Sequence, residues 1–258
     1  SIRAMRRHEI ERIGLAWMSG VIDDEASLAG MTDVYDAAIE ASLQWAIQHR
    51  INDIQIDEAP AAIAIIGMGR YGGREVNFSS DADVIIIYRP AEGADDDQAN
   101  LFARKVQEDL RAILQGPTTF EPKIELDMDL RPEGKNGPLV RSYASCEEYY
   151  RSWASTWEHQ ALLRARYAAG DASLAEDFLM NIADPLRYPK IDLTETQIAE
   201  IRKLKARMEA ERLPRGVRRD RHLKLGKGGL SDVEWTIQLL QLQHAGDNAN
   251  LRVNGTLQ

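Results

Sequence analysis

The chain has little cysteine, no excess of basic charge and no long apolar run, and each of these shortages excludes a class of protein. Its one cysteine, Cys146, cannot form an internal disulfide, which favours a reducing cytoplasm over a secreted, disulfide-held fold. The net charge of −9 disfavours general nucleic-acid binding, which requires a basic surface. Because no signal peptide or membrane-spanning segment is evident, the sequence predicts a soluble, cytoplasmic protein with neither nucleic acid nor a membrane as partner.

The 258 residues are enough for one large domain or two modest ones, and their pattern predicts three segments. Residues 1–58 predict a helical lead-in, because apolar residues recur at helical spacing over 3–18 and 32–49. Residues 59–142 predict a compact core of strands and helices, and residues 143–258 a helical domain. The abrupt ends of the sequence lead us to expect a piece of a longer protein.

Within the core, apolar runs predict strands at 61–66, 83–88 and 123–130, and helical periodicity predicts a helix at 98–115. After residue 138 the pattern is helical throughout. This helical part holds several spacings of the capping-box type, in which a Ser or Thr is followed three residues later by Glu or Gln. They are Ser145 with Glu148, Ser155 with Glu158, Thr194 with Gln197, and Ser231 with Glu234.

The stretch Gly67-Met68-Gly69-Arg70-Tyr71-Gly72 matches the dinucleotide-binding fingerprint GxGxxG and follows an apolar run that predicts a strand. The nearest acids, Asp81 and Asp83, stand only nine and eleven residues after Gly72, whereas a ribose-binding acid lies about 20 residues beyond the glycines. Residues 73–80 are also too few for a parallel crossover helix, which needs about a dozen. The context therefore disfavours a nicotinamide or flavin site.

Asp81 and Asp83 have another explanation. Residues two apart on a strand point the same way, so both carboxylates are expected on one side of the strand that follows. Such a pair is commonly a solvated turn, but two hard carboxylates also suit Mg²⁺, which completes its shell with water and nucleotide phosphates. Gly72 and Gly73 would let the backbone approach phosphate oxygens, and a short helix starting there would offer free amides.

The predicted third strand supplies more acid. Glu125, Asp127 and Asp129 alternate with apolar residues, so they are expected to share one face with Arg131. An outward, solvated face is the ordinary explanation of such a pattern. Beside a pair of metal ligands on a neighbouring strand, a third carboxylate would instead suit phosphoryl transfer, in which the extra acid deprotonates an incoming hydroxyl.

Together, the glycine pair, the run Ser80-Asp81-Ala82-Asp83 before an apolar strand, and a third Asp on a later strand resemble the DNA polymerase β-type nucleotidyltransferase superfamily. More specifically, segments 67–88, 127–140, 156–170 and 223–235 resemble the glutamine synthetase adenylyltransferase family. The resemblance implies an α+β fold, with a small mixed sheet and helices plus a helical domain. It also implies Mg²⁺-dependent transfer of AMP from ATP to a tyrosine hydroxyl of glutamine synthetase, with release of pyrophosphate, in the control of nitrogen assimilation.

The resemblance further implies roles for single residues. It makes Asp81, Asp83 and Asp127 the catalytic carboxylates and metal ligands. The nucleotide-binding residues that it implies are Gly72, Gly73, Ser80, Arg131 and Lys224. Asp129 stands where other members commonly have Arg, and strand parity alone leaves the choice between Asp127 and Asp129 open.

Full-length members of that family join an adenylylating half and a deadenylylating half. Segment 157–166, which contains His159, resembles the adenylylating half, and a PII-type signalling protein is implied as a partner through the full-length enzyme. Two alternatives stay open. The chain could be the deadenylylating half, in which phosphate attacks the AMP–tyrosine bond and gives ADP, or a noncatalytic nucleotide-sensing module.

Overall fold

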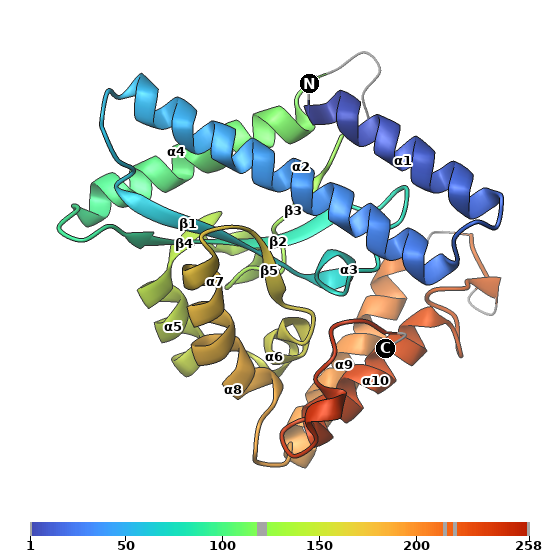
Figure 1. Ribbon diagram of the computed structural model, residues 1–258. Helices are drawn as coiled ribbons and strands as arrows, with labels where there is room; N and C mark the ends of the chain where they lie inside the picture. The colour runs from blue at the N-terminus through green and yellow to red at the C-terminus, as the bar shows by residue number, and fades with distance from the viewer. Residues whose placement is uncertain (1, 118–122, 214–215, 219–220, 257–258) are drawn as a thin grey trace.

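The computed structural model describes residues 2–117, 123–213, 216–218 and 221–256, and it shows a mixed sheet between layers of helices (Figure 1). The strands are β1 (Ala61–Gly67), β2 (Ala82–Pro90), β3 (Leu126–Asp127), β4 (Val140–Ser142) and β5 (Arg166–Gly170). Their order is β3-β2-β1-β5, with β4 also paired to β2. β1 is antiparallel to β2 and β5, whereas β3 and β4 are parallel to β2. The predicted α+β fold with a small mixed sheet is confirmed.

The central strands are apolar along most of their length because helices cover both faces of the sheet. Side chains alternate between two cores, with Ile63 and Ile65 of β1 in the first and Ala64 and Ile66 in the second. The first core is covered by the upper layer of Figure 1, which consists of α1 (Ile2–Met18), α2 (Asp24–Asp53) and α4 (Asp96–Gln115).

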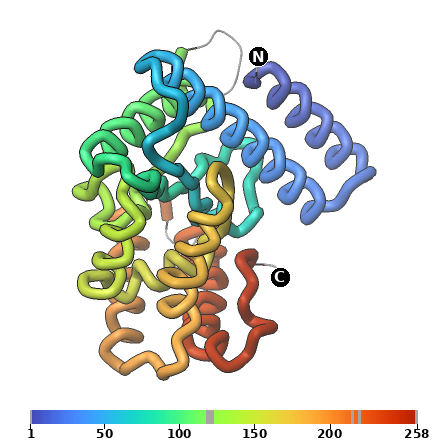
Figure 2. Tube along the Cα trace, turned by 60° about the vertical axis from the view of Figure 1, so that its left-hand side comes forward, coloured from blue at the N-terminus to red at the C-terminus, as the bar shows by residue number. Residues whose placement is uncertain are grey.

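The second core is covered by a lower layer of short helices. These are α5 (Tyr143–Ser152), α6 (Thr156–Leu162), α7 (Ala172–Phe178), a π-helical turn at Leu179–Ala183, and α8 (Asp184–Arg187). Next to them, α9 (Glu195–Arg212) and α10 (Leu230–His244) pack around a third apolar cluster. Figure 2 shows both helices at the end of the molecule away from α1. Further short helices are α3 (Gly69–Gly72), η1 (Gly134–Asn136) and η4 (Ala249–Leu251).

The third predicted strand is much shorter than expected. β3 contains only Leu126 and Asp127, because the backbone N–H of Asp129 donates a 2.8 Å hydrogen bond to Asp127 Oδ1 and the chain turns there. The prediction that Glu125, Asp127, Asp129 and Arg131 share one strand face is therefore wrong beyond Asp127. Glu125 is exposed, whereas Arg131 is buried.

The expectation that the chain is entirely helical after residue 138 is also wrong. Both β4 and β5 lie beyond that residue, and β5 extends the sheet by pairing with β1. The predicted divisions at residues 58 and 142 thus separate segments that share a core. Across the first division, α2 contacts α4, and both lie on the same face of the sheet; across the second, β5 pairs with β1 and contacts α2. Among the described residues, α9 and α10 share a third cluster with Leu163 and Tyr188, which lie outside both helices.

Two of the four predicted capping boxes are confirmed, at Ser155 with Glu158 and at Thr194 with Gln197. The other two are wrong, because α5 is capped by Ser142 and α10 begins after Gly229. Cys146 is buried and unpaired. In the part of the chain that the structure describes, no helix combines the length and the apolar character needed to cross a bilayer.

Candidate functional site

The glycine turn after β1 packs directly against Asp83. Gly69 has φ +51°, and a Cβ at this position would lie 2.1 Å from Asp83 Oδ2, so only glycine fits there. The backbone N–H of Met68 also donates a 2.8 Å hydrogen bond to the carbonyl of Asp83. These contacts fix the carboxylate beside the turn. The sequence motif includes Gly69, but nothing in the sequence shows that its missing Cβ leaves room for Asp83, fourteen residues later.

Gly72 and Gly73 have a different position from the one predicted. α3 ends at Gly72 and Gly73 is its C-cap, so the expected helix starting at this pair is wrong. A Cβ on Gly72 would lie 2.0 Å from the carbonyl oxygen of Arg164, and one on Gly73 would lie 3.0 Å from that of Asn254. Both glycines therefore allow two later chain segments to approach α3 closely. Their contact with a triphosphate stays a prediction.

The structure brings Asp81, Asp83 and Asp127 together at the start of β2. Asp83 and Asp127 are direct partners in the parallel pairing of β2 with β3, and Asp81 stands one residue before β2. Asp81 is exposed, whereas Asp83 and Asp127 are half-buried. Burial, with added repulsion from Asp81 and Asp127, raises the pKa of Asp83 to about 7, although the positive charges of Lys224 and Arg70 oppose this rise.

The donor chemistry of these carboxylates fits a hard divalent cation. They offer oxygen ligands, and their mutual repulsion, seen in the raised pKa of Asp83, is what a bound cation would relieve. Among the described residues, however, no group of three or more His, Cys, Asp or Glu side chains is arranged so that it could hold a metal ion. The role of Asp81, Asp83 and Asp127 as Mg²⁺ ligands therefore stays a prediction.

The Asp129 carboxylate faces basic side chains. Its side chain is 45% exposed and lies 3.2 Å from Lys135 Nζ and 3.8 Å from Arg131 Nη1. Arg131 is buried and donates hydrogen bonds to the carbonyls of Gly137 (3.0 Å), Met128 (2.7 Å) and Lys135 (3.2 Å). Arg131 thus holds the loop after β3 in shape. The predicted nucleotide contact of Arg131 stays a prediction.

Ser80 likewise has a structural role in the loop before Asp81. Its hydroxyl accepts a 3.0 Å hydrogen bond from the backbone of Asn77 and donates a 3.1 Å hydrogen bond to Asn77 Oδ1. Its carbonyl accepts a 2.9 Å hydrogen bond from the hydroxyl of Tyr35 on α2. The loop that carries Asp81 is therefore tied to α2.

On one side of Asp83 the structure forms a small, highly charged cavity of about 180 Å³. It is lined by Gly69, Arg70, Glu75, Asp83, Arg164, Lys224, Glu234 and Gln238. Lys224, from the segment between α9 and α10, thus lies in the same cavity as Asp83, and its predicted nucleotide contact stays a prediction. Glu75 and Gln238 were not anticipated, and no sequence signal marks them.

Arg164 and Glu75 tie this cavity to the C-terminal segment. Arg164 Nη1 lies 3.7 Å from Glu75 Oε1, and the guanidinium also donates to the carbonyl of Asn254 and the hydroxyl of Thr256. The backbone of Thr256 in turn donates to Glu75. Two residues that line the cavity beside Asp83 are thus linked to a segment far away in the sequence.

A second cavity, of about 670 Å³, lies on the other side of the carboxylates. Asp81, Asp127 and Asp129 line it together with Lys123, Lys135 and side chains of α4. The candidate site is therefore a row of carboxylates between a small cavity that contains Lys224 and a larger one that opens toward α4.

The pairing of β1 with β2 disfavours a dinucleotide site at the GxGxxG stretch. β1 and β2 form a direct antiparallel pair, so no crossover helix joins them, and the acids precede β2 instead of following it. A dinucleotide fold requires parallel strands at this point.

A family model described as glutamate-ammonia ligase adenylyltransferase matches residues 1–181 of the chain. The chain belongs to this family. The matched region includes the sheet, both Asp residues at the start of β2 and Asp127. The resemblance drawn from segments 67–88 and 127–140 is thereby confirmed, as is the assignment of the α+β fold to a nucleotidyltransferase core.

This member of the glutamate-ammonia ligase adenylyltransferase family is similar, along nearly all of its own 258 residues, to curated relatives. These relatives are named "Bifunctional glutamine synthetase adenylyltransferase/adenylyl-removing enzyme". The protein of Bifidobacterium longum (strain NCC 2705) is 79% identical over 258 residues, which are 100% of this chain and 24% of the relative. That of Mycobacterium tuberculosis (strain ATCC 25618 / H37Rv) is 48% identical over 256 residues, 99% of this chain and 25% of the relative. The chain thus spans about a quarter of the length of the curated relatives it matches.

Because the glycines serve an antiparallel turn, we expect no measurable affinity for NAD(H), NADP(H) or flavins, and Mg²⁺-dependent binding of ATP instead. Isothermal titration calorimetry with each cofactor checks this expectation. Micromolar binding of a nicotinamide or flavin cofactor would contradict it.

Proposed function

We propose that this chain carries a catalytic centre that transfers AMP from ATP to a tyrosine hydroxyl of glutamine synthetase and releases pyrophosphate. One observation carries the proposal: Asp83 and Asp127 lie side by side on parallel strands, next to Asp81 and between two cavities. The names of the relatives support glutamine synthetase as the acceptor protein. The transfer needs two substrates to meet at one point, and the two cavities supply a separate approach for each.

In this proposal Asp81, Asp83 and Asp127 would hold Mg²⁺, which supplies charge neutralisation on the phosphates when it is bound. Asp127 has a second role. The tyrosine oxygen attacks the α-phosphorus of ATP, the bond to pyrophosphate breaks, and Asp127 accepts the proton of the hydroxyl. A tyrosine with an ordinary pKa near 10 needs this help at neutral pH. Asp127 is suited to it because it lines the larger cavity, through which a protein acceptor can approach.

The phosphates of the nucleotide are proposed to lie on the opposite side, in the cavity beside Lys224. The positive charges of Lys224 and Arg70 act on Asp83 and face the position where phosphates would meet the carboxylates. Gly72, Gly73, Ser80 and Arg131 remain in the proposed nucleotide site by family resemblance only, because their observed contacts are structural.

We propose the adenylylating direction because segment 157–166, with His159, resembles that half of the family. The names of the relatives cover both directions, so removal of AMP is the second candidate. We further propose a cytoplasmic location and, in the longer protein, regulation through a PII-type partner.

Product analysis tests the proposal and its direction. With ATP and unmodified glutamine synthetase, we expect AMP-modified protein and pyrophosphate. If AMP-modified glutamine synthetase and phosphate give ADP instead, while the forward transfer is absent, the chain belongs to the removing half. If neither reaction occurs in the full-length natural protein that contains this chain, the proposed function is wrong.

The raised pKa of Asp83 predicts how stability depends on pH and Mg²⁺. An unfolded Asp has a pKa near 3.9, so the folded chain loses stability as the pH rises from about 4 through about 7, where Asp83 becomes charged. Without divalent cations, Asp83→Asn should therefore have a higher melting temperature than the wild type at pH 8 and nearly the same one at pH 4.5. Adding Mg²⁺ at pH 8 should raise the melting temperature of the wild type only.

Thermal unfolding followed by circular dichroism measures these differences. Asp129→Asn is the matched control, since Asp129 is half exposed and paired with Lys135, and its melting temperature should follow that of the wild type. An equal advantage of Asp83→Asn at pH 4.5 and pH 8 would contradict the assigned cause.

A further inference from the structure

The larger cavity beside the carboxylates continues into a groove along α4. A third cavity, of about 750 Å³, lies between α4 and the segment Pro138–Val140. It shares Arg111, Gln115 and Leu139 with the cavity that Asp81 and Asp127 line, so the two are continuous. One end of the resulting groove is at the carboxylates, and the other is near Asn100.

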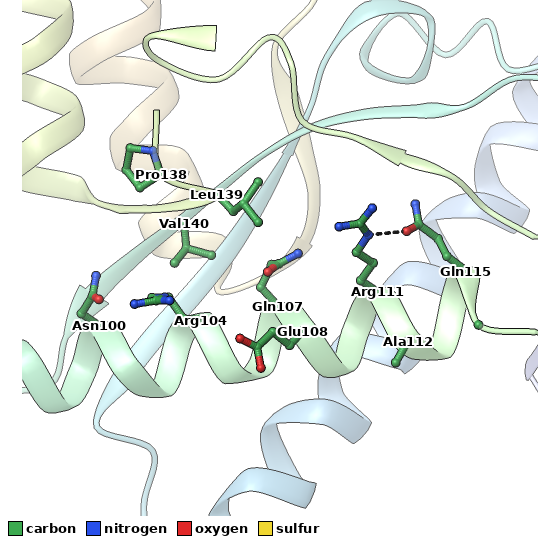
Figure 3. A pocket seen from close by; sticks show the side chains of 11 residues that line it. Asn100, Arg104, Gln107, Glu108, Arg111, Ala112, Gln115, Pro138, Leu139 and Val140 are labelled. Atoms are coloured by element: carbon green, nitrogen blue, oxygen red, sulfur yellow. Dashed lines mark hydrogen bonds between the residues drawn. The ribbon is translucent and has the colours of Figure 1, made fainter. Parts of the chain in front are cut away.

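One face of α4 forms the floor of this groove. Asn100, Arg104, Gln107 and Arg111 follow one another at intervals of four, three and four residues, which places them on one side of a helix. Figure 3 shows these side chains rising toward Pro138–Val140, with Arg111 donating a 2.6 Å hydrogen bond to Gln115. Arg104 and Arg111 are exposed, and Leu139, on the opposite wall, is 38% exposed.

Gln107 gives independent evidence for a ligand in the groove. Its side chain is only 4% exposed and lines the groove, yet its Nε2 has no hydrogen-bond partner. Buried amide donors are almost always satisfied in folded proteins, because an unsatisfied one loses its hydrogen bonds to water without replacement. Because Gln107 stands in the wall of the groove, a turn of its side chain would bring this free donor to an acceptor of a bound molecule, such as a peptide carbonyl.

We propose that this groove binds the extended segment of glutamine synthetase that flanks the acceptor tyrosine; this inference rests on the proposed function. Each of the two cavities has the size of a small-molecule site, about 300–1,000 Å³, and joined end to end they offer the length that a chain segment needs. Gln107 Nε2 donates to a backbone carbonyl of that segment, and Arg104 and Arg111 face its acidic side chains. The tyrosine then reaches Asp127 at the end of the groove.

Two variants of α4 and a matched control test the groove. Gln107→Met removes the unpartnered amide at similar volume, and Arg104→Glu reverses a charge that lines the groove. Arg202→Glu makes the same charge change at an exposed position of α9, which does not line the groove. All are made in the full-length natural protein that contains this chain.

We expect Gln107→Met to raise the KM for glutamine synthetase about fivefold, as one lost hydrogen bond does, and Arg104→Glu to raise it at least about tenfold. The KM for ATP and the kcat at saturating glutamine synthetase should stay within about twofold of wild type. Gln107→Met should not lower the melting temperature, because the amide nitrogen that it removes has no hydrogen-bond partner. Arg202→Glu should match the wild type throughout.

Biolayer interferometry of immobilised glutamine synthetase provides a readout that does not depend on turnover. The wild type should bind, and Arg104→Glu should bind at least about tenfold more weakly. If the wild type transfers AMP but both groove variants keep its KM and its affinity for glutamine synthetase, the groove assignment is overturned while the proposed function stands. A change in the KM for ATP alone also overturns it. If the wild type neither binds nor modifies glutamine synthetase, both proposals fall.

Discussion

Asp127→Asn should lower kcat by at least about a hundredfold while changing the affinity for ATP much less. A general base on the attacking hydroxyl contributes about 10²–10⁴-fold in rate, and Asn cannot accept the proton. Asp127 is the direct partner of Asp83 across β2 and β3, so it lies beside another of the proposed catalytic carboxylates. Steady-state transfer assays measure kcat, and ATP titration measures affinity.

Asp129→Asn is the matched comparison, two residues further along. We expect it to stay within roughly tenfold of wild type, since Asp129 is half exposed and faces Lys135 and Arg131 instead of Asp83. Circular dichroism confirms that both variants are folded. If Asp129→Asn lost its activity and Asp127→Asn kept it, the third catalytic carboxylate would be Asp129 and not Asp127.

Asp83→Asn and Asp81→Asn should each abolish detectable transfer at millimolar Mg²⁺. Each change removes a proposed negative metal ligand but almost no volume, so the fold should survive. For Asp83 the folded state should even gain stability at neutral pH, because a half-buried charge surrounded by other carboxylates disappears.

Transfer is measured with each variant over a range of Mg²⁺ concentrations. Wild-type turnover by either variant at ordinary Mg²⁺ would show that the metal ligands lie elsewhere. Asp129→Asn again serves as the control for loss of one negative charge near the site.

The sequence predicted those elements whose pattern is complete within a short segment. β1 and β2 are continuous apolar runs because both of their faces are buried, and α4 is an amphipathic helix. The residue pattern within each segment therefore predicted all three elements. Asp81 and Asp83 were found for the same reason, since their spacing before an apolar strand is visible in one stretch of residues.

Elements that depend on distant partners escaped prediction. β5, Arg166–Gly170, has no strong strand pattern and is a strand because β1 offers it an edge. β3 ends early because the Asp127 carboxylate binds the backbone of Asp129, a local bond that competes with sheet pairing. Gly69 also belongs to this group, since the clash that forbids a side chain there involves Asp83 on the next strand.

The most direct test of the account is transfer of label from α-labelled ATP to glutamine synthetase by the full-length natural protein that contains this chain, with the Asp83→Asn variant in parallel. We expect the wild type to place labelled AMP on a tyrosine of glutamine synthetase, with one pyrophosphate released per AMP, and Asp83→Asn to place none. No label from the wild type, or undiminished label from Asp83→Asn, would contradict the claim that the carboxylates at the start of β2 perform the transfer.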